Sequence, residues 1–358
     1  ASVRRMAAPV RFALVGSGNV ALLHARALEG VSGATLALVA GRNAESTRAL
    51  AARFGVEGVD VETAFARADV DAVIIGTPSG THADLGTQAA LAGKHVLVEK
   101  PIDVTLERAH ALVDACRVAD VRLGVIFQNR FLPEVALLRR AIARGRLGRL
   151  LVADGFVKWY RAPTYYTQAP WRGTKALDGG GALMNQAIHT ADLLLHLVGD
   201  VARVRAIVRR QRHADIESED TAIALLEYGG GACGVLEAST ALRPGWSRKL
   251  ELHGEAGSVA LEGNAITTWQ VDGHGEEEEE LEKLRAARVA TSGGAADPMD
   301  VDLAPHRAQI ADFVAAVHER RPPAIDGAEG TRALALVRAI YRAADTGEST
   351  AVSAEVAR

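Results

Sequence analysis

An amide, an imidazole and a carboxylate occur close together in residues 178–195, DGGGALMNQAIHTADLLL. If the run after the glycines is a helix, Asn185, His189 and Asp192 share one face, because they are four and three residues apart. Burying polar groups without partners is unfavourable. This face therefore either bonds internally, with His189 paired to Asp192 and to backbone, or borders a polar cleft. In a cleft, the imidazole could exchange protons near neutral pH.

A glycine-rich turn stands between an expected strand at 10–15 and an expected helix, in VRFALVGSGNVALLHARAL. Its spacing is G-x-G-x-x-A. Gly16 permits a tight turn, Gly18 lets the backbone approach a pyrophosphate, and Ala21 keeps helix and strand close. Unpaired N–H groups at the helix start would meet the phosphates. We therefore predict a dinucleotide site rather than an ordinary glycine-rich turn. Its expected contacts are Gly16, Gly18, Asn19, Val20 and Ala21.

The end of the next expected strand, LALVAGRNAES, bears on the choice of dinucleotide. NAD enzymes usually have Asp or Glu here to bind the ribose 2′-hydroxyl, whereas this chain has Gly41 and Arg42. A guanidinium can bind a 2′-phosphate through paired donors. Arg42 therefore favours NADP(H) over NAD(H). An Arg42 that only stacks on the adenine would leave the choice open.

Two further strands end in polar residues, at the edge where ligands bind in open α/β sheets. One is followed by IIGTPSGTHADL, in which the backbone would turn over the cofactor before a helix starts at His82. The other ends in GKHVLVEKPIDVTLERAHAL. Adjacent Glu and Lys at a strand end are usually surface charges, so their role depends on context. The cofactor contacts expected here are Thr77, Pro78, Ser79, His82, Glu99 and Lys100.

Four motifs, GSGNVA, TPSGTH, VLVEKP and GGGALMNQAIHTADLL, follow one another over nearly the whole chain. In this respect the chain resembles the Gfo/Idh/MocA family of nicotinamide-dependent sugar oxidoreductases. The segments WYRAPTYYTQAPWRGT and DGGGALMNQAIH are most similar to the branch that oxidises the C3 hydroxyl of UDP-N-acetylglucosaminuronic acid. The resemblance implies NADP or NAD as cofactor. It also implies hydride transfer to or from a secondary hydroxyl or ketone of a sugar, a sugar derivative or a nucleotide sugar.

The resemblance gives the polar residues roles. The histidine of the motif, His189, is then a catalytic acid/base, and Lys100 donates to the reacting oxygen. Either His189 or Lys100 carries the proton, and the sequence leaves that choice open. Asn185 stands where many family members have Asp, which would stabilise a protonated histidine. An amide can only orient the imidazole, so we expect a less basic His189 and an Asn185 that contacts substrate. The nucleotide-sugar branch also has Asn at this position.

Aromatic and basic side chains alternate between residues 156 and 172. Flat rings suit sugar C–H groups and arginine forks suit carboxylates or phosphates. A sheet face with an oligomer contact is the alternative. The resemblance places Trp171 and Arg172 near the nicotinamide, with Gln128 bordering the same space. The substrate contacts expected overall are Arg130, Tyr160, Arg161, Tyr166, Asn185, His189 and His306.

The elements expected around these residues form two domains of an α/β protein. In residues 1–130, short strands alternate with helices, which favours βαβ units and a doubly wound parallel sheet of the Rossmann type, with residues 1–8 as a tail. In residues 131–358, longer β-rich runs joined by turns favour an open, mostly antiparallel sheet. This second domain would serve substrate binding and oligomerisation. Its closing helices, at 305–320 and 329–346, can pack back on the first domain.

Composition restricts the class of protein. Of 358 residues, 48% are hydrophobic and 24% charged, which is typical of a soluble globular protein. A net charge of −3 gives no basic field for nucleic acid or a membrane surface, and no Cys/His cluster has zinc spacing. Cys116 and Cys233 both lie in apolar runs, so we expect buried thiols and a cytoplasmic location. The family resemblance implies a homo-oligomer, a dimer or a tetramer.

Other functions remain compatible with the sequence. They are a cyclic-polyol dehydrogenase of the inositol type, a sugar–sugar oxidoreductase that keeps its cofactor bound, and a non-catalytic sensor of dinucleotides. A sensor needs the glycine loop but neither Lys100 nor His189, so the presence of both favours an enzyme. The loop at 291–298 is expected to be flexible, and the acidic run at 276–280 to be a solvated turn or helix face.

Overall fold

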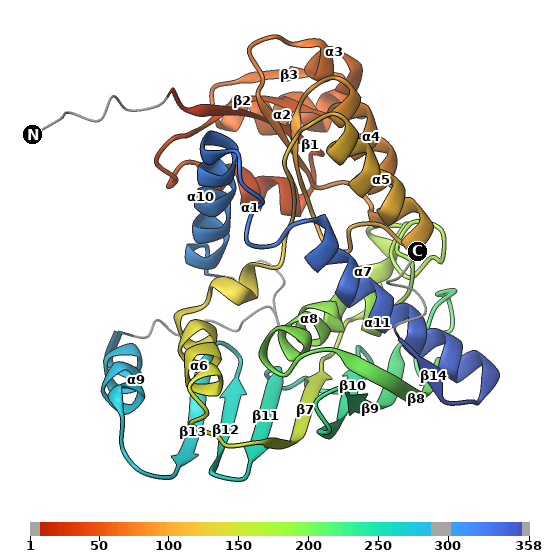
Figure 1. Ribbon diagram of the computed structural model, residues 1–358. Helices are drawn as coiled ribbons and strands as arrows, with labels where there is room; N and C mark the ends of the chain where they lie inside the picture. Colours follow the sequence, from red (N-terminus) through yellow and green to blue (C-terminus); the bar gives the residue numbers. More distant parts are fainter. Residues whose placement is uncertain (1–7, 288–301, 353–358) are drawn as a thin grey trace, which may run out of the picture. The chain divides into compact units, whose positions relative to one another are not determined.

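The computed structural model describes residues 8–287 and 302–352. In the first part of the chain, six short apolar runs form a parallel sheet in the order β3-β2-β1-β4-β5-β6 (Figure 1). This order is that of a doubly wound dinucleotide-binding sheet. The central strands are almost wholly buried because helices cover both faces of such a sheet. The strands are β1 (Val10–Val15), β2 (Ala34–Ala40), β3 (Glu57–Val59), β4 (Ala72–Ile75), β5 (His95–Val98) and β6 (Leu123–Val125).

Side chains that accept hydrogen bonds from free N–H groups start several helices of this region. Asn43 accepts from Ser46 N at 3.0 Å, and Thr105 caps its helix in the same way. Such caps satisfy donors that the helix itself leaves unpaired. The helices are α1 (Asn19–Leu28), α2 (Ala44–Arg53), α3 (Val61–Ala66), η1 (Ser79–Thr81), α4 (His82–Leu91) and α5 (Leu106–Val118).

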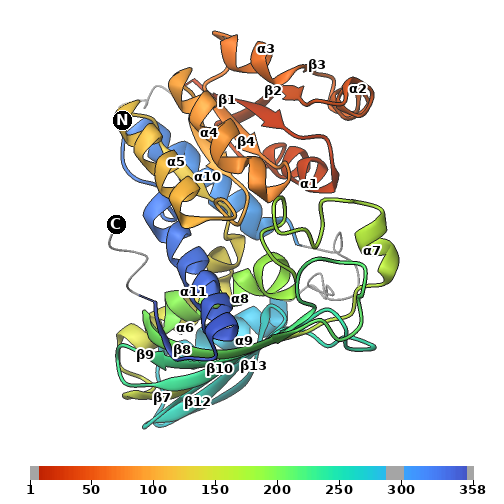
Figure 2. The ribbon, with the colours of Figure 1, turned by 90° about the vertical axis from the view of Figure 1, so that its right-hand side faces the viewer.

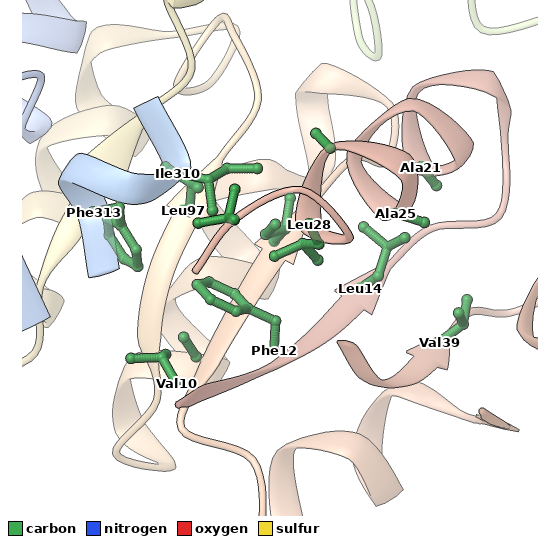
Figure 3. Packing of buried hydrophobic residues seen from close by; sticks show 14 of the residues in the cluster. Val10, Phe12, Leu14, Ala21, Ala25, Leu28, Val39, Leu97, Ile310 and Phe313 are labelled. Atoms are coloured by element: carbon green, nitrogen blue, oxygen red, sulfur yellow. The ribbon is translucent and has the colours of Figure 1, made fainter. Parts of the chain in front are cut away.

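A helix from much later in the chain, α10 (Ala304–Glu319), completes the core of this sheet. Phe313 of α10 packs on Phe12 of β1 with ring centroids 6.2 Å apart, and Ile310 is buried in the same cluster (Figure 3). Gln309 fixes the helix to the last strand, since its Nε2 donates to Val125 O at 2.7 Å and its Oε1 accepts from Phe127 N at 3.1 Å.

The second sheet has eight strands in the order β13-β12-β11-β7-β10-β9-β8-β14. All neighbours are antiparallel except β7 and β10, which pair in parallel. In Figure 2 the helices of this region lie on one side of the sheet. The strands are β7 (Leu150–Lys158), β8 (Val201–Arg209), β9 (Thr221–Tyr228), β10 (Cys233–Ser239), β11 (Lys249–Gly254), β12 (Gly257–Glu262), β13 (Ala265–Val271) and β14 (Thr350–Ala351).

The remaining helical segments accompany this second sheet, apart from the first turn of α11. They are η2 (Gln128–Phe131), α6 (Pro133–Ala143), α7 (Pro163–Thr167), η3 (Ala182–Ala187), α8 (Ile188–Leu197), α9 (Glu276–Ala287) and α11 (Gly327–Thr346). The parallel sheet followed by a mostly antiparallel one confirms the predicted α/β fold class.

The described residues form two compact units. The first lies within Ala1–Gln128 and Leu303–Thr331, and the second within Asn129–Asp302 and Arg332–Arg358. The closing helix α10 thus belongs to the unit of the parallel sheet. The expected loop at 291–298 lies outside the described residues, as does the tail except for its last residue.

One expectation about burial is wrong. Cys116 is buried on α5, as predicted, but Cys233 is exposed at the start of β10. Cys233 follows the turn at Gly229-Gly230-Gly231, where the strand has only just begun. An apolar run around a residue therefore does not bury its side chain when that residue stands at the end of a sheet strand.

Candidate active site

The glycine loop leaves room for a phosphate at the start of α1. Gly16 has a φ of 120°, and a Cβ there would lie 2.7 Å from Gly76 O, so a side chain is excluded. A Cβ on Gly18 would instead meet nothing within 4 Å, and no described side chain caps α1. Asn19 and Val20 are exposed, whereas Ala21 is fully buried. Exposed N–H groups at an uncapped helix start suit a pyrophosphate.

Arg42 lies in the turn between β2 and α2 and is exposed. The turn itself is tightly held. A Cβ on Gly41 would come within 2.5 Å of Thr47 Oγ1, and Ser17 Oγ of the glycine loop lies 2.8 Å from Ser46 Oγ. The turns after β1 and β2 are therefore joined, and the guanidinium extends from a fixed backbone.

His82, the first residue of α4, joins two loops of the same sheet edge. Its Nδ1 lies 2.8 Å from Pro101 O and its Nε2 lies 2.9 Å from Thr77 O, and the ring is buried. Burial lowers the pKa of His82, and the hydrogen bonds to the two carbonyl groups only partly oppose this shift. The Thr77 hydroxyl in turn lies 2.7 Å from that of Thr81. His82 thus fixes the loop with Thr77, Pro78 and Ser79 to the loop with Lys100.

Glu99 is buried directly before Lys100. Its Oε1 lies 2.7 Å from His24 Nε2, and its Oε2 accepts from Lys100 N at 3.0 Å. Burial opposes ionisation, but the hydrogen bond from His24 and the positive charges nearby lower the pKa of Glu99 to about 2. His306 of α10 packs its ring edge-on to His24 at 5.8 Å. His306, expected as a substrate contact, therefore lies in the first unit beside this pair.

The helix that carries His189 starts as a wider turn. Residues Ala182–Ala187 are π-helical, and the α-helix proper begins at Ile188. From 182 to 195 all side chains are buried except three partly exposed polar ones, Asn185, Gln186 and His189. π-helical turns occur frequently at functional sites. The helix thus presents an amide pair and an imidazole from an otherwise apolar segment.

Asp192 does not belong to that exposed group, contrary to the shared face that the spacing predicted. It is fully buried, and its carboxylate binds the guanidinium of Arg130 of η2 at 2.6–3.1 Å through two nitrogens. This buried, bidentate ion pair supplies the polar partner that the sequence required. It ties α8 to η2. The expected substrate contact through Arg130 stays a prediction.

A hydrogen-bonded chain holds the exposed group. Asp178 Oδ1 accepts from Asn185 Nδ2 at 2.5 Å, and Asn185 Oδ1 accepts from Gln186 Nε2 at 2.9 Å. Gln186 Nε2 also lies 2.9 Å from the Tyr165 hydroxyl, and its Oε1 accepts from Arg161 Nη2 at 3.1 Å. The buried Asp178 also accepts from backbone N of the loop before it. Asn185 is therefore fixed in orientation by a carboxylate.

A second buried carboxylate holds the start of the same helix. Glu219 accepts hydrogen bonds from Leu183 N at 2.8 Å, Gly181 N at 3.1 Å and the Tyr341 hydroxyl at 3.0 Å. Burial raises its pKa to about 7, although these donors oppose the shift. A Cβ on Gly180 would overlap the Tyr341 hydroxyl, so the glycines before the helix permit this close packing.

The loop after β7 supplies cationic and aromatic groups. Arg161 is buried, its guanidinium carbon is 4.9 Å from the Trp159 ring centroid, and desolvation lowers its pKa. Arg172 lies over the Tyr165 ring at 4.0 Å and beside Trp171 at 5.8 Å. These residues form a compact cation–aromatic cluster in the second unit.

Two other aromatic residues expected to contact substrate face different partners. Tyr166 is buried, and its hydroxyl lies 2.9 Å from Thr240 Oγ1. The Tyr160 hydroxyl accepts from Arg243 Nη2 at 2.7 Å. Gln128, at the end of the first unit, has a buried Oε1 without a hydrogen-bond partner among the described residues.

The candidate residues thus fall into two sets. The glycine loop, Arg42, Lys100 and His306 belong to the first unit, and Asn185, His189 and the cluster around Arg161 belong to the second. Motif spacing did not reveal His24, Asp178, Gln186 or Glu219. Asp178 and Gln186 flank motif residues, whereas only three-dimensional contact reveals His24 and Glu219.

The first set fits a dinucleotide. Uncapped N–H groups follow Gly18, an exposed guanidinium follows β2, and Lys100 stands at the carboxyl edge of the sheet beside an ionised Glu99. In the described ranges, no three or more His, Cys, Asp or Glu side chains are grouped to hold a metal ion. None of the helices in those ranges combines the length and apolar character that crossing a membrane requires.

Comparisons with known proteins agree with this arrangement. Residues 10–127 match the oxidoreductase family with an NAD-binding Rossmann fold, and residues 135–260 match the Gfo/Idh/MocA C-terminal domain. The crystal structure of the WlbA dehydrogenase from Bordetella pertussis, in complex with NADH and UDP-GlcNAcA, is 31% identical. The match covers 96% of this chain and 98% of that chain with a TM-score of 0.88.

Inositol dehydrogenases are also similar. Inositol 2-dehydrogenase of Rhizobium meliloti is 29% identical over 340 residues, which are 93% of this chain and 96% of that protein. The scyllo-inositol 2-dehydrogenase (NAD(+)) of Bacillus subtilis is 30% identical over 70% of this chain and 73% of that protein. These matches confirm the resemblance that the four motifs indicated. The chain therefore belongs to the Gfo/Idh/MocA family of oxidoreductases and is an enzyme of the nicotinamide-dependent dehydrogenase and reductase class.

Proposed function

We propose that this enzyme oxidises a ring hydroxyl of a nucleotide-linked sugar acid of the UDP-N-acetylglucosaminuronate type, at C3. The similarity to the WlbA dehydrogenase, whose structure contains UDP-GlcNAcA, carries this proposal, because it extends over 96% of the chain. The second unit supports it with a buried guanidinium, Arg161, which suits an acidic substrate, and with aromatic rings that suit sugar faces.

Each polar residue then has a defined task. The turn with Gly16 and Gly18 would hold the dinucleotide, whose nicotinamide would supply the hydride acceptor for the carbinol carbon. His189 takes the hydroxyl proton, as a partly exposed imidazole on an otherwise buried helix. Lys100 donates to the reacting oxygen and stabilises its developing charge. Asn185, oriented by Asp178, binds the substrate rather than relaying a proton.

Turnover of UDP-N-acetylglucosaminuronate tests this function. We expect reduction of the dinucleotide by the purified enzyme with this substrate, and loss of turnover in Lys100→Ala and His189→Ala while both variants still bind the dinucleotide. A matched panel of myo-inositol, scyllo-inositol and free N-acetylglucosaminuronate distinguishes the alternative, since the inositol dehydrogenases are similar over most of the chain. Efficient turnover of an inositol, with none of the nucleotide sugar, would refute the proposal.

Arg42 bears on cofactor preference, and we propose that the enzyme prefers NADP(H). No acidic residue occurs in 40–44 to bind a ribose 2′-hydroxyl, and Arg42 is exposed at the end of β2. We expect Arg42→Ala to lower kcat/KM for NADP⁺ by roughly tenfold or more, as for loss of a charge-assisted hydrogen bond, with kcat/KM for NAD⁺ nearly unchanged. A wild-type enzyme that uses NAD⁺ at least tenfold better than NADP⁺ would contradict this preference.

Exposed apolar residues of the second sheet point to self-association. Ile207, Ile223 and Leu225 lie on β8 and β9 and are each at least 45% exposed. Neighbouring exposed apolar groups are typical of interfaces. We therefore propose that the enzyme is a homo-oligomer. We also propose that it is cytoplasmic and that its domains are 1–130 and 131–358, with the closing helix α10 packed back on the first. The mass in solution, with Leu225→Glu as a variant expected to dissociate, tests the association.

A further inference from the structure

Two arginines from different loops converge on one tyrosine in the second unit. Arg243 Nη2 donates to the Tyr160 hydroxyl at 2.7 Å, and its guanidinium carbon is 4.5 Å from the ring centroid. The guanidinium carbon of Arg212 is 5.5 Å from the same centroid. The two guanidinium carbons are therefore at most about 10 Å apart, because each is this close to one point.

In the part of the chain that the structure describes, this pair of charges has no carboxylate partner. Among the described residues no carboxylate lies within 4 Å of Arg212 or Arg243, whereas other arginines of the unit are ion-paired, such as Arg144 with Glu276 and Arg332 with Asp200. The hydrogen bond from Arg243 and the charges of both arginines lower the pKa of Tyr160. Two cations beside one neutral tyrosine side chain favour an anion near them.

The surroundings of Tyr160 suit a ligand that extends away from the helical segment that carries Gln186 and His189. Arg161, next to Tyr160 in the chain, contacts Gln186 of that helix at 3.1 Å, and consecutive Cα atoms are about 3.8 Å apart. Tyr160 itself is half-buried, so part of its side chain is open to solvent. Trp246, three residues after Arg243, is 65% exposed and offers a ring on which a base can stack.

We propose that Arg212 and Arg243, held on Tyr160, form a binding site for the diphosphate of the nucleotide-linked substrate. Guanidinium forks bind phosphoryl oxygens in pairs, and two forks match two phosphoryl groups. The identity of the ligand rests on the proposed function. The anion site rests on the geometry alone, so the two can be tested separately.

Titration calorimetry with UDP, uridine and inorganic phosphate tests the site on the full-length enzyme. We expect UDP to bind the wild type and the double variant Arg212→Gln/Arg243→Gln to bind it at least about 100-fold more weakly, at roughly tenfold or more per charged hydrogen bond. Uridine, which lacks phosphate, should be affected less than about threefold by the same change. Arg149→Gln is the matched control, since Arg149 is an exposed arginine directly before β7 and pairs with Glu255. It should leave UDP affinity unchanged.

Kinetics separate this site from the proposed function. In the double variant, KM for UDP-N-acetylglucosaminuronate should rise in parallel with the loss of UDP affinity, while KM for the dinucleotide stays constant. Equal UDP affinity in wild type and double variant, or inorganic phosphate binding as tightly as UDP, overturns the diphosphate site even if the nucleotide sugar is oxidised. UDP binding that depends on both arginines, without turnover of any nucleotide sugar, supports the site and refutes the proposed reaction.

Discussion

The buried carboxyl of Glu219 should make the stability of this enzyme depend on pH near neutrality. Burial raises its pKa from the ordinary value of 4.5 to about 7. Since one pKa unit corresponds to about 1.4 kcal/mol, ionising Glu219 in the folded protein costs about 3 kcal/mol more than in the unfolded chain. Below pH 4.5 the group is protonated in both states, so the penalty is absent. The penalty develops as the pH rises from the unfolded-state pKa of 4.5 to the folded-state pKa of about 7, and it is complete above that value.

We therefore compare the wild type with Glu219→Gln, which is neutral at every pH. Between pH 5 and 8 the free energy of unfolding of the wild type should fall by about 2–3 kcal/mol relative to the variant. Urea denaturation at pH 5, 6, 7 and 8 measures both proteins. Tyr341→Phe is the second comparison, because it keeps the carboxyl but removes a donor that stabilises its charge. The pH range over which the free energy of unfolding of Tyr341→Phe falls should therefore extend to higher pH than that of the wild type.

A difference in stability between the two proteins that does not depend on pH would contradict this reasoning. If the difference between wild type and Glu219→Gln stays constant within about 0.5 kcal/mol over this pH range, Glu219 is not a buried titrating group. The reasoning from burial would then be refuted. A change in the difference that is confined to pH values below about 4.5 would mean that the three donors outweigh desolvation and that the pKa of Glu219 is lowered.

Three further substitutions probe the site. Asp192→Asn leaves the buried Arg130 guanidinium without its carboxylate and should destabilise the fold by about 3–5 kcal/mol; a loss below about 1 kcal/mol in urea denaturation would contradict this. Asn185→Asp replaces the amide whose Nδ2 lies 2.5 Å from Asp178 Oδ1 with a second carboxyl. Its kcat/KM should therefore fall more steeply than that of the wild type as pH rises from 6 to 9, and parallel pH profiles would show that the contact is unimportant. Gly16→Ala puts a Cβ 2.7 Å from a carbonyl oxygen at a φ of 120° and should abolish dinucleotide binding in a fluorescence titration, a result that near-wild-type affinity would exclude.

Sequence patterns predicted the first unit well because its signals are local. The strand at 10–15 has the predicted bounds, since it is an apolar run closed by Gly16, and the two further strands, β4 and β5, formed before the polar residues at which they were expected to end. In the second unit, the turn at Gly229-Gly230-Gly231 that joins two β-rich runs is local in the same way, with Gly231 N donating to Tyr228 O at 2.9 Å. Strand bounds of this kind depend on neighbours in the chain, which a sequence displays directly.

The strands β11, β12 and β13 were not predicted. Their burial alternates only in part, and polar residues such as Glu251 and Thr268 interrupt the apolar pattern. Pairing with β7 and with one another, rather than local propensity, makes them strands. The same limit applied to Asp192, because helical spacing can place a residue on a face but cannot reveal a partner 62 residues away.

Three charged groups from outside the helix fix the segment that presents Asn185, Gln186 and His189. Glu219 holds its first N–H groups, Asp178 holds the first exposed amide, and Arg130 binds Asp192 one turn beyond the imidazole. An apolar helix packed only by methyl groups could rotate by small amounts at little cost, whereas directional, charge-assisted hydrogen bonds resist rotation. Conservative changes at Glu219 or Asp192 should therefore lower kcat more than they raise KM, because they disturb the orientation of His189 while Asp178 still orients the substrate-binding Asn185. Glu219→Gln is the clearest case, since its amide can offer only one oxygen to the two N–H groups that the carboxylate now accepts.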